Sequence, residues 1–342
     1  MEMPTKRIKA IFINYAAALA LLFIGYQFFN YQPYYKEFFS GSHNLILFTI
    51  STKEVFYYYI LLNVIVLPFF YLTLPNNHQT KSVLFWRAII NLPKRKPDEN
   101  EKVAILGTLV KVFFIPLVLL WFFDHTVNTL WNFVDFIEFG EFFPKGYWLL
   151  FHFIFLVDVA FFLIGYTIEH PKLKNEIRSV EPTLLGWFVA LACYPPFNNA
   201  VTEMIGWYSS DYPQIHDPTW QMTFGIAILF LLSIYAWASV ALNVKASNLT
   251  NRGIVSKGPY AYVRHPAYVA KNLAWWIGSM PILYAMWFEK TAFEFLLAIV
   301  SVLGWTSIYY MRAITEENHL NRDPEYQSYC KKVKYKFIPK VY

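Results

Sequence analysis

Long apolar runs alternate with short polar connections along most of the chain. A membrane-spanning helix needs about 20 predominantly apolar residues to cross the hydrocarbon core. Runs of about that length lie between charged breaks, and we expect each to be a membrane-spanning helix. The eight runs are approximately residues 11–29, 55–74, 103–123, 147–168, 183–205, 220–242, 268–286 and 292–311. The pattern predicts an all-α, polytopic membrane helix bundle.

The fifth run is the least regular of these segments. It contains Pro195, Pro196, Asn198, Asn199 and Glu203, so we expect its helix to be broken. Such a break is tolerated at membrane depth where neighbouring protein or water satisfies the freed backbone groups. The alternative is a re-entrant segment, which would invert the topology of everything before it relative to the C-terminus.

The basic residues of the connections predict an orientation. Lys and Arg gather in the N-terminal tail and in the second, fourth and sixth connections, whereas the first, third and fifth contain only Lys36, Lys53 and Lys145. Because Lys and Arg favour the cytoplasmic side, we expect both termini in the cytoplasm. The regular alternation of basic and non-basic connections favours an even number of spans, and therefore a fifth run that crosses the membrane.

Composition supports the same class of protein. The chain is 56% hydrophobic and only 15% charged, with a mean hydropathy of +0.33, which is far from soluble averages. The net charge of +6 is explained by basic residues that meet anionic lipid, so no nucleic-acid partner is needed. We expect a multi-pass protein of the plasma or inner membrane.

Chemistry-bearing residues are unevenly distributed along the chain. Residues 1–215 are expected to form an N-terminal group of about five spans, either an acceptor pocket or a scaffold, and residues 216–342 the region that carries the site. Lys111 and Asp158 are charged residues inside spans that could pair with each other. Residues 81–97 mix apolar and basic positions, which suits either a helix on the membrane surface or an amphipathic helix packed on the bundle. The polar C-terminal tail predicts a break at Asp323 and Pro324, a short helix over 326–332 and an extended end.

One loop leads directly into the seventh run. Gly258 and Pro259 predict a turn, and Pro266 suits the first turn of the following helix. Arg264 and His265 come just before that helix. Backbone N–H groups at a helix N-terminus favour an anionic group such as a carboxylate or phosphate.

A second cluster lies on the last run. Trp305, Tyr309, Arg312 and Glu316 are spaced by four, three and four and share a helix face, with Glu317 beside them. Arg312 and Glu316 alone could be an ordinary helix-surface ion pair. A short turn joins the seventh and eighth runs, however, so this face and the loop are expected to meet at the same cytoplasmic level.

These residues resemble a known family. GPYAYVRHPAY, RAITEENHL and EYQSYCKKVKYKFIP together are similar to the isoprenylcysteine carboxyl methyltransferase and phospholipid methyltransferase superfamily, over about the last hundred residues. The resemblance implies S-adenosylmethionine bound at the cytoplasmic face, with Arg312 and Glu316 at the reaction centre. The cofactor-binding candidates are Tyr260, Arg264, His265, Pro266, Ala267, Tyr268 and Glu317, together with Asn248 on position alone.

The predicted activity is methyl transfer to a lipophilic acceptor that enters from the bilayer, at a carboxylate, amine or hydroxyl of a lipid or prenylated molecule. No metal is required, and the eight His and two Cys show no metal-ligand spacing. One alternative is an NADPH-dependent reductase, because the ending YCKKVKYKFIPKVY also resembles membrane sterol reductases. Those enzymes tend to lack the GPY and RHP prolines and to have Asn where this chain has Ala267. A non-enzymatic transporter or scaffold is the other alternative.

Overall fold

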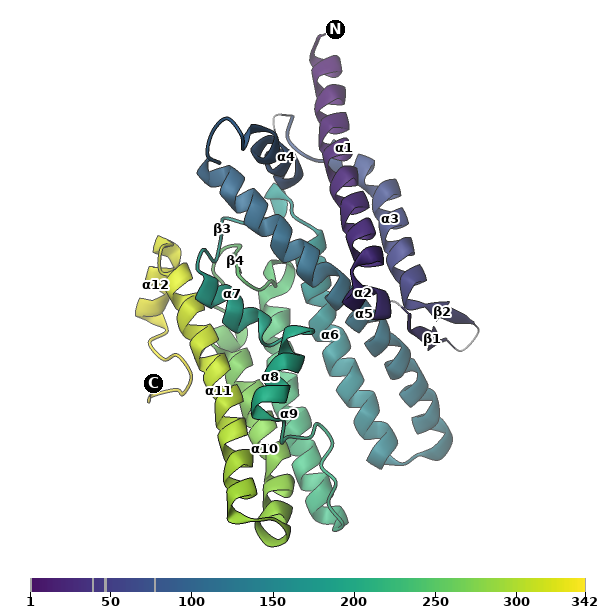
Figure 1. Cartoon of the computed structure of the whole chain (residues 1–342), viewed down its shortest axis with the longest axis vertical. Coiled ribbons are helices and arrows are strands. Elements are labelled where there is room, and N and C mark those ends of the chain that lie inside the picture. The colour runs from purple at the N-terminus through teal and green to yellow at the C-terminus, as the bar shows by residue number, and fades with distance from the viewer. Residues whose placement is uncertain (1, 39, 46–47, 77, 342) are drawn as a thin grey trace.

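The computed structural model describes residues 2–38, 40–45, 48–76 and 78–341. The chain is a bundle of long helices with two short two-stranded sheets (Figure 1). In the strand pair β1 (Ser42–Asn44) and β2 (Thr49–Ser51), Ser42 lies opposite Ser51; in β3 (Ser179–Val180) and β4 (Thr250–Asn251), Ser179 lies opposite Asn251. The predicted all-α, polytopic class is confirmed.

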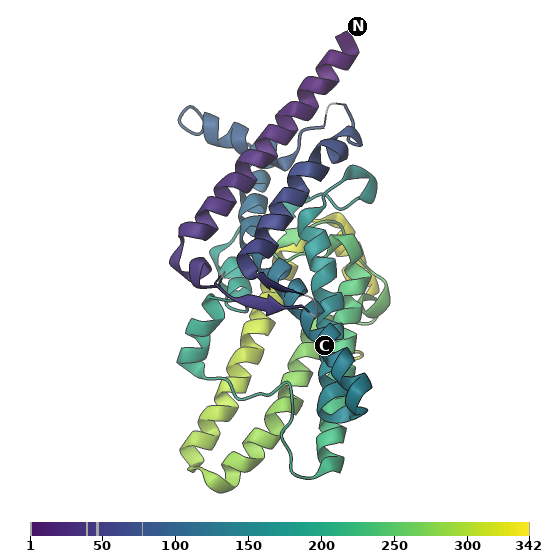
Figure 2. The same cartoon turned by 90° about the vertical axis from the view of Figure 1, so that its right-hand side faces the viewer.

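The first helices form a layer beside the rest of the bundle. Helix α1 (Glu2–Tyr31) packs against α3 (Thr52–Leu72), and the short α2 (Pro33–Phe38) and the first strand pair connect their ends at the bottom of the layer (Figure 2). Helix α3 begins where the Ser51 hydroxyl accepts a hydrogen bond from the Glu54 amide and the Glu54 carboxylate caps the Ser51 amide in return.

Helix α4 (Lys81–Asn91) packs on α1 and α5 and buries Leu84 and Ala88. Of the two interpretations of this segment, the packed helix is confirmed. Arg87 and Arg95 both donate to Glu101, at 2.8 and 2.7 Å, which fixes α4 to the start of α5.

Helix α5 (Glu99–Phe139) is longer than predicted. Its 41 residues correspond to about 60 Å at 1.5 Å per residue, about twice the hydrocarbon thickness. The expected end near residue 123 is therefore wrong. No Gly or Pro follows Pro116 until Gly140, which ends the helix in a left-handed conformation (φ 68°).

The remaining long helices are α6 (Tyr147–Thr167), α9 (Pro218–Leu242), α10 (Pro266–Glu289) and α11 (Ala292–Leu320). Helix α6 packs between α5 and α9, and α10 between α9 and α11. Shorter turns are η1 (Phe142–Gly146), η2 (Pro171–Leu173), η3 (Asn243–Lys245) and η4 (Gly258–Ala261). The predicted break and short helix of the tail are confirmed, because Asp323 caps α12 (Pro324–Lys332). The expected extended end is wrong: after residues 333–335 the chain bends at 336–338 and turns at 339–341.

The fifth run is broken, as predicted. It forms α7 (Leu184–Leu191) and α8 (Phe197–Ile205), which both pack along α11. Ser179, just before α7, is 2.9 Å from His319, and Gly206, just after α8, accepts a hydrogen bond from Ser301 at 3.1 Å. The segment thus follows α11 for several turns without returning, which favours a crossing segment over a re-entrant one.

Six helical segments among the described residues are long and apolar enough to cross a membrane, which makes this an integral membrane protein. They are Thr5–Tyr31, Thr52–Leu72, Glu99–Phe139, Phe142–Thr167, Pro218–Lys245 and Ala292–Leu320. Two of the eight predicted runs are outside this set: the α7–α8 pair, because each piece is short, and α10, which carries Lys271 and Asn272.

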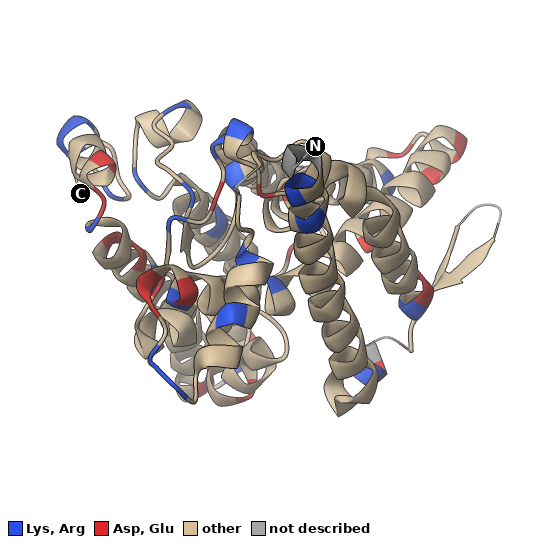
Figure 3. Cartoon of the chain, turned by 90° about the horizontal axis from the view of Figure 1, so that it is seen from above, with Lys and Arg blue, Asp and Glu red and all other residues tan. Residues whose placement is uncertain are grey.

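The basic connections meet at one end of the bundle. Arg7 donates to the Leu72 carbonyl at 2.9 Å, and His78 is 3.6 Å from Glu176. Asn251 donates to Asp323 at 2.8 Å. Figure 3 looks onto this end, where Lys and Arg lie on several connections. The predicted grouping of the N-terminal tail with the second, fourth and sixth connections is therefore reproduced.

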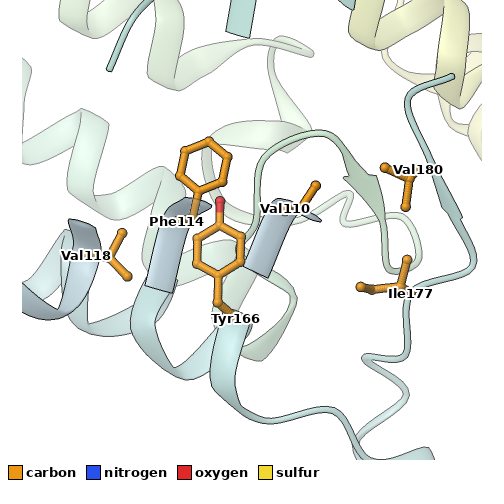
Figure 4. Packing of buried hydrophobic residues seen from close by; sticks show 6 residues of the cluster. All are labelled: Val110, Phe114, Val118, Tyr166, Ile177 and Val180. Atoms are coloured by element: carbon orange, nitrogen blue, oxygen red, sulfur yellow. The ribbon is translucent and has the colours of Figure 1, made fainter. Parts of the chain in front are cut away.

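A buried aromatic stack lies between α5 and α6. Phe114 of α5 and Tyr166 of α6 lie parallel, with ring centroids 5.1 Å apart, and Val110, Val118, Ile177 and Val180 surround them (Figure 4). The cluster holds α5 and α6 next to the connection that leads to α7.

The suggested pairing of Lys111 with Asp158 is wrong. Lys111 binds Glu169 at 2.9 Å, whereas Asp158 accepts hydrogen bonds from Tyr235 and Ser239. The two acidic residues lie at different levels of the bundle, and Lys111 lies at the level of Glu169. Asp158 precedes Glu169 by eleven residues, which corresponds to about 16 Å along a helix.

Candidate functional site

The loop that precedes α10 is positioned by backbone geometry. Gly258 has φ 62°, in the left-handed region that favours glycine, and an added Cβ would lie 3.0 Å from the Cβ of Ala241. The η4 turn follows, and Pro266 begins α10 after His265. This loop therefore lies closely against the end of α9.

The C-terminal tail holds the loop from the other side. The amide groups of Arg264 and His265 donate to the carbonyls of Tyr335 and Lys336, both at 3.0 Å. The Tyr329 hydroxyl donates to the Tyr260 carbonyl at 2.7 Å. The tail is thus a part of the site.

Glu317 joins three segments through one carboxylate. It lies 3.0 Å from Arg264 Nε, 3.3 Å from His265 Nε2 and 3.1 Å from Lys336 Nζ. Its side chain is only 10% exposed, so these contacts are poorly screened by water. Glu317 therefore ties α11 to the loop and the tail.

Arg312 is a buried cation inside a cage of aromatic rings. Its guanidinium lies 5.4, 5.2 and 5.7 Å from the ring centroids of Tyr194, Tyr268 and Tyr309. It also donates to Asn248 Oδ1 at 2.5 Å. In the described part of the chain, no carboxylate forms an ion pair with it. Because an unpaired buried charge is costly, the site is suited to an anionic ligand.

Glu316 lies at the rim of the same site. It accepts a hydrogen bond from the Tyr268 hydroxyl at 2.7 Å, and its side chain is 43% exposed. His265 Nδ1 is 4.0 Å away, and the His265 ring stacks on Tyr268 with centroids 5.4 Å apart. Glu316 and Glu317, adjacent in sequence, thus have different surroundings.

Asn248 connects the site to helices outside the C-terminal region. Its side-chain amide donates to the hydroxyls of Tyr166 and Tyr194 at 2.8 and 3.1 Å. Its carbonyl oxygen accepts from Arg312. These bonds fix the amide orientation, so Asn248 holds the guanidinium in one place.

A cleft of about 960 Å³, including its mouth, lies between these elements. Eight of the ten predicted site residues line it: Asn248, Tyr260, Arg264, His265, Ala267, Tyr268, Arg312 and Glu316. Burial raises the pKa of Tyr260, so its hydroxyl remains a hydrogen-bond donor.

Residues 221–322 match the model of the isoprenylcysteine carboxyl methyltransferase family. This match confirms the predicted resemblance for the C-terminal region, which we call the methyltransferase-like region, and it supports a membrane methyltransferase as the general class of the protein. No curated protein and no solved structure matches the chain.

Two predicted residues do not line the cleft of the methyltransferase-like region. Pro266 is buried at the first position of α10, and Glu317 faces Arg264, His265 and Lys336. The contacts of Glu317 suit a residue that positions the loop. All ten predicted residues nevertheless lie in one connected neighbourhood.

Other lining residues were not among the predicted candidates. The most polar are Glu181, Tyr194, Tyr235, Lys271, Thr315 and His319. Tyr309 lies on the helix face that the spacing had indicated. Lys271 Nζ is 5.3 Å from the Tyr235 ring centroid. Tyr194 carries no sequence signal beyond its place next to Pro195, in the broken fifth run.

Proposed function

We propose that this protein is an S-adenosylmethionine-dependent methyltransferase of the membrane, and that it methylates a carboxylate at the end of a lipophilic acceptor. The observation that carries the proposal is Arg312, a caged and buried guanidinium without an ion pair among the described residues, across a cleft from the loop at the start of α10. Arg binds carboxylates in a planar, two-pronged geometry, which suits an acceptor of this kind.

The loop side of the cleft fits the proposed cofactor. His265 provides no side-chain cap for α10, so first-turn N–H groups are available to an anionic group such as the cofactor's carboxylate. The stacked rings of His265 and Tyr268 offer faces that attract a cation such as a sulfonium. When bound, S-adenosylmethionine supplies an electrophilic methyl group.

The chain's own residues would mainly position the acceptor. Transfer of a methyl group is an in-line displacement that depends on alignment and on the exclusion of water. Arg312, fixed by Asn248 and three tyrosines, would orient the acceptor carboxylate. Glu316 at the rim would orient the acceptor or take a proton from an amine acceptor. A carboxylate acceptor is already ionised and needs no base.

The same reasoning supports a cytoplasmic site. The cleft is lined by the 247–250 and 260–268 segments, which belong to the end of the bundle where the basic connections meet. Positive residues favour the cytoplasmic side. The apolar chain of the acceptor would enter from the surrounding lipid.

Binding measurements on the detergent-purified protein test the proposal. We expect calorimetry to detect binding of S-adenosylmethionine and of S-adenosylhomocysteine, and no binding of NADPH. NADPH binding alone would replace the proposal with the reductase. If none of the three binds, the non-enzymatic alternative takes its place.

The acceptor is tested with the full chain and a deletion strain. Untargeted lipid comparison is expected to find a species in the deletion strain that is lighter by one methylene mass, and its methyl group in the wild type should be released by mild base as an ester. Arg312→Gln should lose this product, with Arg322→Gln as the matched control, because Arg322 is exposed. A base-stable methyl group on nitrogen would contradict the carboxylate assignment.

A further inference from the structure

A second cavity lies in the N-terminal half of the protein, away from the methyltransferase-like region. It occupies the space between α1, α3, the segment that begins α4, and α5, and encloses about 1250 Å³ including its mouth. It shares no lining residue with the cleft around Arg312. Tyr166 lines this cavity, and its hydroxyl contacts Asn248, which lines the other one. A layer of buried side chains therefore separates the two spaces.

The lining changes from polar to apolar along the cavity. At the end of the bundle where the basic connections meet, it includes His78, Gln79, Thr80, Lys81 and Ser82, together with Lys111, Glu169 and Glu176. Farther along α1, α3 and α5 the lining is mainly apolar, with Asn63 and Thr108 as polar members, and it includes Leu21, Leu22, Gly25, Phe56, Val112 and Ile115. This order of polarity is that of a lipid molecule, with a headgroup region followed by a hydrocarbon region.

The cavity follows the apolar length of the first helices. Its lining extends from Ala18 to Phe29 on α1, from Phe56 to Tyr71 on α3 and from Gly107 to Pro116 on α5. At 1.5 Å per residue these stretches are about 16, 22 and 14 Å long. Phe29 and Phe56 lie at the far ends of the apolar runs 11–29 and 55–74. An acyl chain that enters from the basic end therefore has a path along most of the apolar length of α1 and α3.

One cation at the mouth is available to a phosphate. Glu169 is paired with Lys111 at 2.9 Å, and Glu176 is 3.6 Å from His78. Lys81, by contrast, forms no ion pair within the described ranges. Its ammonium is therefore available to the phosphate of a lipid in the same leaflet, and the neighbouring Ser82 offers a hydroxyl.

We propose that this cavity binds one membrane phospholipid, with the phosphate at Lys81 and an acyl chain between α1, α3 and α5, as a ligand that is not itself methylated. The buried layer around Tyr166 keeps such a lipid away from Arg312 and the loop before α10. The proposal concerns binding alone, and it stands whether or not the protein transfers methyl groups.

Native mass spectrometry of the full chain, delipidated in mild detergent and titrated with phosphatidylglycerol, tests this site. We expect one tightly bound lipid per chain. Gly25→Phe should abolish it, because a Cβ at Gly25 meets only the Phe29 ring, at 3.9 Å, so that a larger side chain extends into the cavity. Lys81→Ala should weaken binding about fivefold, as expected for one Lys near a lipid phosphate.

Matched variants keep the result specific. Ile13→Phe adds a ring on α1 at an exposed position outside the lining, and Lys94→Ala removes an exposed charge from the same connection. Both should retain the lipid. Equal retention in Gly25→Phe and the wild type, in samples with unchanged circular dichroism, would overturn the site.

Two further outcomes separate this proposal from the proposed function. If dodecyl phosphocholine, which shares only the phosphate and one chain, competes with phosphatidylglycerol, recognition of the phosphate is supported. If the bound lipid gains a methyl group on incubation with S-adenosylmethionine, the cavity is an acceptor site and the proposal of an unreactive ligand is wrong. Failure to bind S-adenosylmethionine would leave the lipid measurement unaffected.

Discussion

The contacts of Glu317 lead to a sharp prediction for Glu317→Gln. The substitution keeps the shape of the side chain but removes the charge that faces Arg264, His265 and Lys336. Breaking a buried ion pair on one side costs about 3–5 kcal/mol. Since Lys336 is 24% exposed and regains some hydration, we take about 2–4 kcal/mol as the loss to the ordered loop and tail.

This loss should appear as loosening of the loop and tail and as weaker cofactor binding. A decrease of 2–4 kcal/mol corresponds to about 30- to 1,000-fold in an equilibrium constant. Only the ordered form of the loop is expected to bind, so the apparent affinity falls with its population. We expect S-adenosylhomocysteine to bind at least about tenfold more weakly to the variant.

Hydrogen exchange locates the effect. The amides of Arg264 and His265, which donate to the tail, should exchange faster in Glu317→Gln, while those in the middle of α9 should not change. Glu316→Gln is the matched control, because its half-exposed carboxylate does not contact the tail. Unchanged exchange together with a loss of affinity below threefold would refute the assigned role of Glu317.

Three other predictions concern the cleft and its surroundings. Arg312→Gln should lower methyl transfer by about 30-fold or more, because charge-assisted hydrogen bonds to the acceptor are lost. The melting temperature should change by only a few degrees, because the substitution leaves no carboxylate unpaired. A large drop in melting temperature with normal turnover would contradict this prediction. His265→Ala should weaken cofactor binding, whereas Glu316→Gln should reduce turnover more than binding; calorimetry and steady-state kinetics compare them, and equal loss of binding would refute the division of roles. Burial raises the pKa of Glu169, but Lys111, Arg252 and the Ile177 amide together outweigh it and lower that pKa from 4.5 to about 2. The stabilisation by the ionised carboxylate is therefore complete above about pH 4.5 and lost toward pH 2. In Glu169→Gln the melting temperature should depend less on pH within this window, and at pH 7 it should be lower than that of the wild type.

Much of the fold follows from apolar run length, because a bilayer permits few ways to satisfy the backbone. Run length gave the order of the segments, although two of the eight runs lie outside the six candidate spans, and Pro195 and Pro196 indicated the broken one. It could not give the end of α5, since residues beyond 123 continue to suit a helix. Run length also could not predict which side chains pair between helices. Lys111 is an example, because the apolar residues around it in the sequence do not show that Asp158 lies at a different depth in the bundle.

The site was predictable where its residues are close in sequence. Gly258, Pro266 and the spacing of Arg312 and Glu316 determine a turn, a helix start and a helix face. The contacts of Asn248 with Tyr166 and Tyr194 span 82 and 54 residues, and no local pattern encodes them. The resemblance selected the loop and α11 as the two sides of a site, and the roles of individual residues within it remain predictions.

The aromatic cage around Arg312 has a consequence for the modularity of this protein. The family match begins at residue 221, yet Tyr194 and Tyr166, which hold Arg312 and Asn248, precede it. A fragment cut at the family boundary would leave the guanidinium open on one side and the Asn248 amide without its tyrosine acceptors. A chimera that exchanges the N-terminal helices would therefore have to carry residues 166 and 194 with the C-terminal region, which sets the smallest transplantable unit well upstream of the recognisable one.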